Sequence, residues 1–287
     1  MSVEQVVSAD GTPIAVWRSG AGAPLVLVHG AAADHSRWAP VLPAFEQRFT
    51  VLAIDRRGRG RSGDADDYAI DREFEDVAAV AEWAGEEVSV LGHSHGGVCA
   101  LEAALLTDRI RKLVLYEPPM GFLATPPDVV ERLEALLAAG ERDELLAFFM
   151  REVAGLPPDQ VELLRSLPAW EARLAVAHTI PREERVNREY AFDPDRFREL
   201  QVPTLSRGRR QPRLVQGGRR GRAGGAAGLS RGRPAGAATR GDGHRYRAVH
   251  RRGAELPGAD LGRLTMGEHV RAGELDIRTE QERDSSC

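Results

Sequence analysis

The sequence contains few of the features that would place a protein in a membrane or in an oxidising compartment. It has two cysteines, Cys99 and Cys287, which are too few and too far apart for a disulfide scaffold or a structural zinc site. No run of 18 or more apolar residues occurs, which excludes a transmembrane helix. The segment MSVEQVVSADG lacks a basic region followed by an apolar core, so no secretory signal is expected. We therefore expect a soluble, cytoplasmic protein with no membrane partner.

Lysine is almost absent as well, and the charge is unevenly distributed. A single Lys112 accompanies 38 arginines, which is typical of a GC-rich gene because arginine has the CGN codons. The net charge of −4 averages two unlike parts of the chain. Residues 1–205 hold 21 basic and 34 acidic side chains, whereas residues 206–287 hold 18 basic and 9 acidic ones. Such an asymmetry indicates either a nucleic-acid-binding tail or an abnormality in one part of the chain.

Expected strands and helices alternate along residues 1–117. Two short strands flank an Asp10-Gly11 turn at the start of the chain. Continuous apolar runs, typical of strands buried on both faces, follow at 23–30, 50–55, 87–94 and 111–117. Helical spacing of apolar residues occurs at 73–85 and 97–107, and a short helix fits within 37–49. This alternation predicts an α/β fold with a mostly parallel sheet and helices on both faces.

The pattern changes twice after this part. Residues 118–200 contain four amphipathic helical segments separated by proline and glycine. This pattern predicts a helical insertion that sits on the sheet. Residues 201–205 return to strand character. Residues 206–253 hold 14 arginines, 12 glycines and one acidic residue, without helical or strand periodicity. By composition, the C-terminal region is expected to be disordered or irregular.

The motif Gly92-His93-Ser94-His95-Gly96-Gly97 carries the clearest chemistry. It follows a buried strand and begins a helix, which is the setting of a nucleophile elbow. The glycines allow a tight turn, so the hydroxyl of Ser94 would be exposed at the carboxyl end of the sheet. The helix N-terminus would supply an N–H donor and a favourable dipole for a developing oxyanion.

At this point the sequence resembles the α/β-hydrolase family. His29-Gly30, followed by AAADHSRW, matches the oxyanion-loop signature of that family, and residues 55–62 match its D-x-R-G-x-G-x-S loop. The resemblance implies a hydrolase core at 1–117, a helical cap at 118–200, a return to the core at 201–205 and an anomalous tail at 206–287. It also implies that Ser94 is the nucleophile and that the N–H groups of Ala31 and His95 form the oxyanion hole.

The resemblance further implies an esterase-like enzyme that acts on a small carboxylic ester or related acyl compound through an acyl-enzyme. No cofactor and no metal are expected. Because the same scaffold hosts other reactions, cofactor-free peroxidation and C–C hydrolysis stay open as alternatives.

Other polar and aromatic residues have plainer interpretations. His93 and the side chain of His95 are expected to be packed rather than to act as bases. Glu117 ends the strand at 111–117 and is a candidate alternative acid, because some members of the family place the acid there. We expect the arginine-rich loop 55–62 to be solvated. Phe148, Phe149 and Trp170 fit an acyl pocket and core packing equally well.

The acid and the base of a catalytic triad are missing from their expected positions. The family order is serine, then the acid after the next-to-last strand, then histidine after the last strand. The residues after Leu205 are SRGRRQPR, and the first carboxylate is Asp242. His244 follows no apolar strand and is a doubtful base.

A shifted reading frame after about Leu205 would explain this absence. Codons built from the last two bases of one residue and the first base of the next allow residues 207–222 to read GADASPAWFKAAAEAV. In the same frame, residues 234–258 can read LPGQQHVAMDTATELFTDEVLSFLG. The acid would then be read across the codons of Arg209 and Arg210, and the histidine across those of Thr239 and Arg240.

A binding function is the alternative to catalysis. The chain could be a catalytically silent hydrolase fold with a basic arm that binds nucleic acid. Tyr246 is the sole aromatic residue of residues 206–253, so base stacking is poorly provided for and a nucleic-acid partner is not favoured. The preferred partner is a small-molecule ester or acyl substrate.

Overall fold

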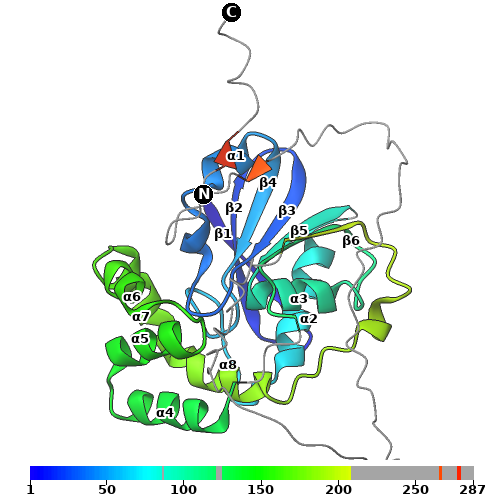
Figure 1. The fold of residues 1–287 in the computed structure, drawn as a ribbon. Helices are drawn as coiled ribbons and strands as arrows, with labels where there is room; N and C mark the ends of the chain where they lie inside the picture. Colours follow the sequence, from blue (N-terminus) through cyan, green and yellow to red (C-terminus); the bar gives the residue numbers. More distant parts are fainter. Residues whose placement is uncertain (86, 121–124, 208–264, 267–276, 279–287) are drawn as a thin grey trace, which may run out of the picture. The chain divides into compact units, whose positions relative to one another are not determined.

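A computed structural model of the protein describes residues 1–85, 87–120, 125–207, 265–266 and 277–278. Within these residues, one sheet has the strand order β1-β2-β4-β3-β5-β6-β7 (Figure 1). The strands are β1 (Ser2–Val7), β2 (Pro13–Gly20), β3 (Ala23–Val28), β4 (Phe49–Ile54), β5 (Val88–His93), β6 (Ile110–Tyr116) and β7 (Thr204–Arg207). β2 pairs antiparallel with β1 and β4, and all the other pairs are parallel. The expected α/β fold with a mostly parallel sheet is confirmed.

The turn between β1 and β2 lies at the expected Asp10-Gly11 position. The carboxylate of Asp10 accepts a hydrogen bond of 3.0 Å from the backbone N–H of Thr12. Gly11 has a φ of 87°, which a residue with a side chain rarely adopts. The local sequence therefore determines the hairpin.

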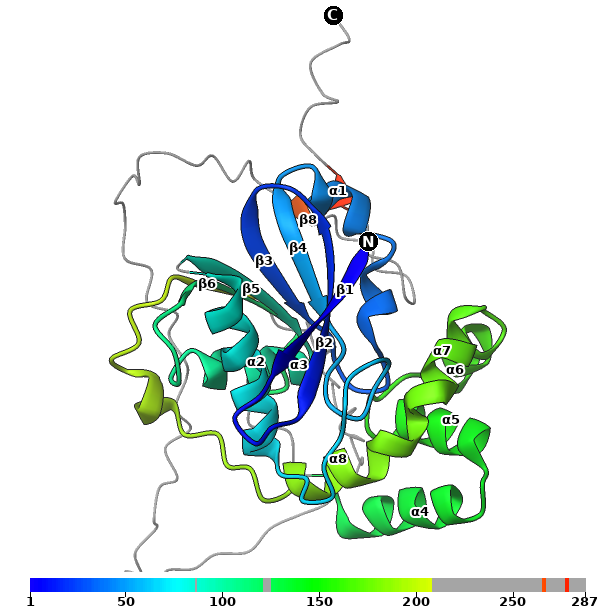
Figure 2. The same cartoon turned by 180° about the vertical axis from the view of Figure 1, so that it is seen from behind.

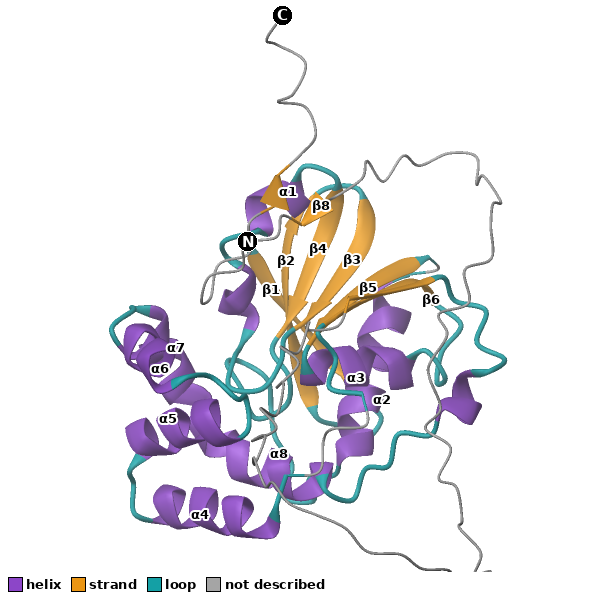
Figure 3. Cartoon of the chain, in the orientation of Figure 1, coloured by secondary structure: helices purple, strands orange, loops and turns teal. Residues whose placement is uncertain are grey.

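The central strands bury their side chains on both faces of the sheet. On one face, alternate residues such as Val26, Leu52 and Val90 form a core with α2 (Ile70–Ala84) and α3 (His95–Ala103). On the other face, Leu25 and Val51 pack with residues of the 3-10 helix η1 (His35–Trp38) and of α1 (Leu42–Glu46). Because successive side chains of a strand point to opposite faces, a continuous apolar run serves both cores. Figure 3 shows the strands of the sheet together with the helices that flank it.

Five α-helices lie between β6 and β7 among the residues that the structure describes. They are α4 (Pro127–Ala138), α5 (Arg142–Glu152), α6 (Pro158–Arg165), α7 (Ala169–Val176) and α8 (Ile180–Asn187), with a 3-10 turn, η2 (Ala177–Thr179), before α8. We call residues 127–187 the helical block. It has its own apolar core, in which Leu133, Leu146 and Trp170 are buried, and α4–α7 lie together beside the sheet (Figures 1 and 2). A second 3-10 turn, η3 (Pro194–Phe197), precedes β7.

The chain returns to the sheet at β7, as the strand character of residues 201–205 predicts. β7 lies parallel to β6, and its four residues are exposed. Most of the tail beyond it lies outside the described residues. The prediction that this region is irregular concerns those residues and stays a prediction. The two short strands β8 (Thr265–Met266) and β9 (Ile277–Arg278) pair with each other. No helix in the described ranges is long and apolar enough to cross a membrane.

Candidate active site

Ser94 occupies the sharp turn between β5 and α3. Its backbone has φ 52° and ψ −126°, a combination that costs about 1–3 kcal/mol for a residue with a side chain. The Ser94 N–H donates to the carbonyl of Tyr116 at 2.9 Å, and the Ser94 carbonyl accepts from Gly97 N–H at 2.8 Å. These two bonds hold the strained turn between the neighbouring strand and the new helix. Ser94 itself is half-buried, at the carboxyl end of β5.

Glycines around the turn permit its close approach to β3. A Cβ on Gly30 would lie 2.9 Å from the Cβ of Ser94, closer than side-chain atoms normally pack. A Cβ on Gly92 would lie 2.6 Å from the Cα of Gly97, and one on Gly96 would overlap the backbone of Val28 and His29. The motif therefore needs glycine at Gly92 and Gly96 because a side chain there would overlap the neighbouring backbone, as well as for the tight turn.

The loop after β3 presents the backbone N–H of Ala31 on the side away from His29. His29 is fully buried, and its Nε2 accepts a hydrogen bond of 3.1 Å from Arg56 N–H. Burial lowers the pKa of His29 to about 3, so the ring is neutral and its Nδ1–H donates to the Gly30 carbonyl at 2.8 Å. In a trans peptide the carbonyl and the following N–H point in opposite directions, so the Ala31 N–H is directed away from this ring.

His95 is the first residue of α3. A residue in the first turn of a helix has no carbonyl four residues earlier to bond, so its N–H is available to a ligand. The side chain of His95 is buried, and its Nδ1 lies 3.7 Å from a carboxylate oxygen of Glu183. Burial lowers the pKa of His95 to about 4 despite this neighbour. The ring thus lies beside Glu183, in a cluster of buried side chains described below.

No base is present beside Ser94 among the described residues. None of them forms a hydrogen bond with the Ser94 hydroxyl through a side chain, and His93 stacks on Tyr116 with ring centroids 5.3 Å apart. Burial, together with the charges of Arg37 and Arg173, lowers the pKa of His93 to about 3. His93 is therefore packed and neutral. His244 and Asp242 lie outside the described residues, as do the positions to which the shifted frame assigns the acid and the histidine.

Glu117 lies at the end of β6, one strand away from Ser94. It is half-buried, and its backbone N–H donates to the carbonyl of Arg207 at 2.7 Å. Its φ of 51° lies in the left-handed region, which a residue with a side chain rarely adopts. The carboxylate of Glu117 thus belongs to the same edge of the sheet as the serine turn.

The expectation that the arginine loop is solvated is wrong. Arg56, Arg57 and Arg59 are each at most 2% exposed. Arg56 donates hydrogen bonds from Nε and Nη2 to the two oxygens of the Glu73 carboxylate, at 2.6 and 2.8 Å. Its Nη2 also donates to the Glu183 carboxylate at 3.0 Å. Arg59 pairs with the same Glu183 oxygen.

Arg57 forms a second buried pair beside this one. Its Nε and Nη2 bond the Asp76 carboxylate at 2.8 and 2.7 Å, and its Nη1 bonds Asp10 at 2.9 Å. Sequence reasoning missed these pairs because the acidic partners come from α2, α8 and the β1–β2 turn. The available signal was the pair of carboxylates, Glu73 and Asp76, within the otherwise apolar face of α2.

The buried ion pairs join α8 of the helical block to the sheet. Burial alone would raise the pKa of Glu183, but Arg56, His95 and Arg59 outweigh it and lower the value to about 2. Glu183 is therefore ionised and holds two guanidinium groups. The adjacent Glu184 has no such partner, and burial and the charge of Glu183 raise its pKa to about 7.

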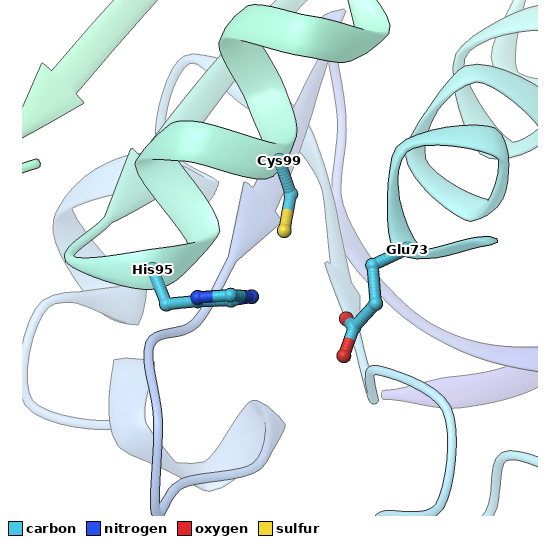
Figure 4. Close-up of side chains that lie close together, drawn as sticks. All are labelled: Glu73, His95 and Cys99. Carbon is cyan, nitrogen blue, oxygen red and sulfur yellow. The ribbon is translucent and has the colours of Figure 1, made fainter. Parts of the chain in front are cut away.

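Glu73, His95 and Cys99 lie close together between α2 and α3 (Figure 4). Their ligand atoms are within 4.8 Å of one another. However, the Glu73 carboxylate is already held by Arg56, and burial raises the pKa of the Cys99 thiol, which favours its protonated form. The guanidinium groups of Arg56 and Arg59 would also repel a cation. These residues therefore do not fit a metal ion.

A second cluster, formed by Asp34, His35 and Asp55, has ligand atoms at a similar spacing. The carboxylate of Asp55 accepts four hydrogen bonds: from His35 N and Nδ1 at 3.0 and 2.7 Å, from Trp17 Nε1 at 2.8 Å and from Arg61 N at 3.0 Å. These donors lower the pKa of Asp55 to about 2 although its burial opposes the change. Asp55 thus holds the start of η1 and the loop 55–62 in place. Its carboxylate oxygens already accept hydrogen bonds from these protein groups.

The aromatic residues that suggested an acyl pocket lie in the helical block. Phe149 and Trp170 are buried in its core, and Phe148 packs against them. Trp170 Nε1 donates to Asp143 at 2.7 Å. A separate cavity of about 410 Å³ is lined by residues 64–68 and by Arg182, Arg185 and Val186. Neither Ser94 nor another residue of the serine turn lines that cavity.

Known proteins resemble this chain in sequence and in fold. The model of the alpha/beta hydrolase family matches residues 25–262. RutD of Azorhizobium caulinodans, named as a carbamate hydrolase, is 29% identical over 212 residues, which cover 68% of this chain and 76% of that protein. The 2-hydroxy-6-oxo-6-(2'-aminophenyl)hexa-2,4-dienoic acid hydrolase of Metapseudomonas resinovorans is 25% identical over 224 residues, covering 71% and 72% of the two chains. The crystal structure of an alpha/beta hydrolase from Sphaerobacter thermophilus is 42% identical with a TM-score of 0.65, covering 71% of this chain and 80% of that one.

Proposed function

Because the chain belongs to the alpha/beta hydrolase family, we propose that it is a serine hydrolase with Ser94 as its nucleophile. The observation that carries this proposal is the backbone of Ser94, which is held at φ 52° between β5 and α3. Strain of this kind persists where the surrounding structure enforces it, and it clusters at functional sites. Gly30, Gly92 and Gly96 supply the space that the strained turn needs.

The reaction we propose proceeds through an acyl-enzyme. The Ser94 hydroxyl oxygen attacks the carbonyl carbon of a small ester or related acyl compound while a histidine takes its proton. The N–H groups of Ala31 and His95 stabilise the oxyanion, and the alcohol leaves with the proton from the histidine. A water molecule then attacks the acyl carbon, and the acid is released from Ser94. The helical block acts as a cap over this site.

We assign the missing acid and base to the region beyond β7. β7 ends at Arg207, at the point of the chain where the family order calls for the acid. The absence of a carboxylate between Leu205 and Asp242 supports a shifted reading frame after about Leu205. Glu117 is the alternative acid, and His244 is the alternative base.

Covalent labelling tests the proposed nucleophile. A fluorophosphonate probe and a p-nitrophenyl ester are applied to the chain as written, to a frame-restored version and to the Ser94→Ala variant of each. We expect the frame-restored version to be labelled and to hydrolyse the ester, and the chain as written to react weakly or not at all. Labelling of the restored protein that survives Ser94→Ala would overturn the assignment of Ser94. Strong Ser94-dependent labelling of the chain as written would show that it contains a base.

The gene tests the frame independently of activity. A shift predicts that third-position GC content falls after about codon 205 in the written frame and recovers in the shifted one. Uniformly high third-position GC content through codon 258 in the written frame would refute the shift.

C–C bond hydrolysis is the second candidate, because one relative is named for hydrolysis of a dienoic acid. Incubation of the restored protein with a 2-hydroxy-6-oxo-dienoic acid would separate the two reactions. Release of the carboxylic acid fragment from this compound, together with inertness toward esters, favours C–C hydrolysis.

A further inference from the structure

The loop that follows β3 is packed into the helical block. Ala32 is fully buried, and its side chain belongs to the same apolar core as Leu146 of α5 and Trp170 of α7. Ala31 packs against that core as well. The loop that carries the Ala31 N–H is therefore continuous with β3 at one end and held by the helical block through its side chains.

Ala32 has a backbone conformation that is unfavourable for alanine. Its φ is 49°, in the left-handed region, where the Cβ of a residue crowds the following carbonyl oxygen. The φ of a residue sets the plane of the preceding peptide, so this angle also fixes the direction of the chain at Ala31. An alanine without external contacts would relax toward negative φ and would turn Ala31 with it. Contacts to Ala32 therefore have to hold this turn.

Arg173 of α7 makes such a contact. Its Nη1 donates a hydrogen bond of 3.3 Å to the backbone carbonyl of Ala32. Burial and the nearby charge of Arg37 lower the pKa of Arg173 to about 10, so the guanidinium group still carries its charge at pH 7. The charge of Asp34 favours this state, but no carboxylate among the described residues forms an ion pair with Arg173. Because a partly buried charge without an ion-pair partner costs stability, stability of the fold does not account for this arginine.

The same loop touches the serine turn. Gly30 directly precedes Ala31, and a Cβ on Gly30 would lie 2.9 Å from the Cβ of Ser94. The Ala31 N–H belongs to the peptide that joins Gly30 to Ala31. A rotation of the loop at this peptide therefore changes the position of that N–H relative to Ser94.

The second proposed oxyanion donor also contacts the helical block. The Nδ1 of His95 lies 3.7 Å from the carboxylate of Glu183 on α8. The block thus contacts the loop of one donor through α7 and the residue of the other donor through α8. This arrangement gives the block a part in the geometry of the oxyanion hole, in addition to covering the site.

We propose that Arg173 is a positioning residue for the oxyanion hole, which holds the Ala32 carbonyl and thereby keeps the Ala31 N–H in place beside Ser94. Arg173 acts through the loop and does not touch the reacting atoms. This inference rests on the proposed roles of Ser94 and of the Ala31 N–H. It implies that the helical block has to be seated on the loop for the oxyanion hole to be complete.

Steady-state hydrolysis of p-nitrophenyl acetate by the frame-restored protein tests the catalytic part. Arg173→Met keeps the length of the side chain and removes its donors. Loss of an oxyanion donor lowers kcat about 10²- to 10³-fold, so displacement of the donor should lower it about 10- to 100-fold. KM should stay unchanged, because the oxyanion forms only after the substrate is bound. Arg173→Lys should recover part of the rate because it keeps a charged donor.

Matched variants separate positioning from stability. Arg173→Met should melt at or above the temperature of the parent protein, because it removes a partly buried charge. Arg151→Met is the control, since Arg151 bonds Glu144 within α5 at 2.7 Å, and its kcat should equal that of the parent. If Arg173→Met does not fold, Arg173→Gln replaces it, because the shorter side chain loses the contact with Ala32.

Hydrogen exchange in the full chain as written tests the loop without requiring turnover. Mass spectrometry compares peptides that cover residues 29–36 in the parent, Arg173→Met and Arg151→Met proteins. We expect exchange in these peptides to be about tenfold faster in Arg173→Met alone, since it loses a hydrogen bond from a charged group. Exchange in peptides of β4 and β5 should be the same in all three proteins.

Several results would overturn the positioning role. These are unchanged exchange of residues 29–36 in folded Arg173→Met, an unchanged kcat, and a fall in kcat that is matched by faster exchange throughout the protein. Failure of this role is distinguishable from failure of the proposed function. Normal Ser94-dependent hydrolysis by Arg173→Met refutes only the positioning role, whereas faster exchange of the loop without Ser94-dependent hydrolysis by any form of the chain refutes only the nucleophile.

Discussion

Replacing Glu183 by alanine should strongly destabilise the protein. One oxygen of its carboxylate bonds Arg56 Nη2 at 3.0 Å and also contacts Arg59 Nη2, and all three side chains are at most 1% exposed. The Glu183→Ala variant would leave two buried guanidinium groups to share Glu73 alone. Removing one partner of a buried ion pair costs about 3–5 kcal/mol because the remaining charge stays in the interior.

The expected change is large enough for routine measurement. For a domain of this size, about 1 kcal/mol shifts the melting temperature by about 2–4 °C, so Glu183→Ala should lower it by about 6–20 °C. Thermal and urea unfolding measure this change. Glu171→Ala, at an exposed position of α7, is the control, and it should stay within about 0.5 kcal/mol of the parent protein.

The pH dependence of unfolding gives a second test of the same group. The pKa of Glu183 is lowered from 4.5 to about 2 in the folded protein, so folding favours the ionised form. Its contribution is therefore complete above about pH 4.5 and is lost as the pH falls toward 2. Glu183→Gln should weaken this acid-dependent loss. A Glu183→Ala variant as stable as Glu171→Ala would refute the reasoning that the buried pairs hold α8 to the sheet.

Other perturbations test the remaining geometry. Glu184, whose pKa is raised to about 7, stays protonated in the folded protein while the unfolded chain ionises, so stability should fall as the pH rises from about 4.5 to 7. Glu184→Gln should remove this slope in urea unfolding, and an unchanged slope would contradict the assignment. Ser94→Gly should relieve the strain at φ 52° and raise stability by about 1 kcal/mol, while it abolishes labelling of the frame-restored protein. A Ser94→Gly variant less stable than Ser94→Ala would argue against stored strain. Gly30→Ala would place a Cβ 2.9 Å from that of Ser94 and should lower the free energy of unfolding by about 1–3 kcal/mol. Calorimetry would measure this change.

Local signals in the sequence predicted most of the architecture. The apolar runs located β3 to β6 because parallel strands buried on both faces need apolar side chains at consecutive positions. The Gly92–Gly97 motif located the serine turn because its requirements are short-range: a strand end, a residue at positive φ and a helix start. Most of the residues beyond Arg207 lie outside what the structure describes.

The tertiary structure alone decided which charges are buried. From the sequence, the arginines of loop 55–62 are expected to be solvated, because no acidic residue within the loop pairs with Arg56. Its partners, Glu73 and Glu183, lie 17 and 127 residues away, and burial of a guanidinium group is tolerable only once such partners arrive. The sequence by itself therefore determined where the serine turn lies, because its signals are local, whereas the folded chain determined which charges are buried, because their partners are distant in sequence.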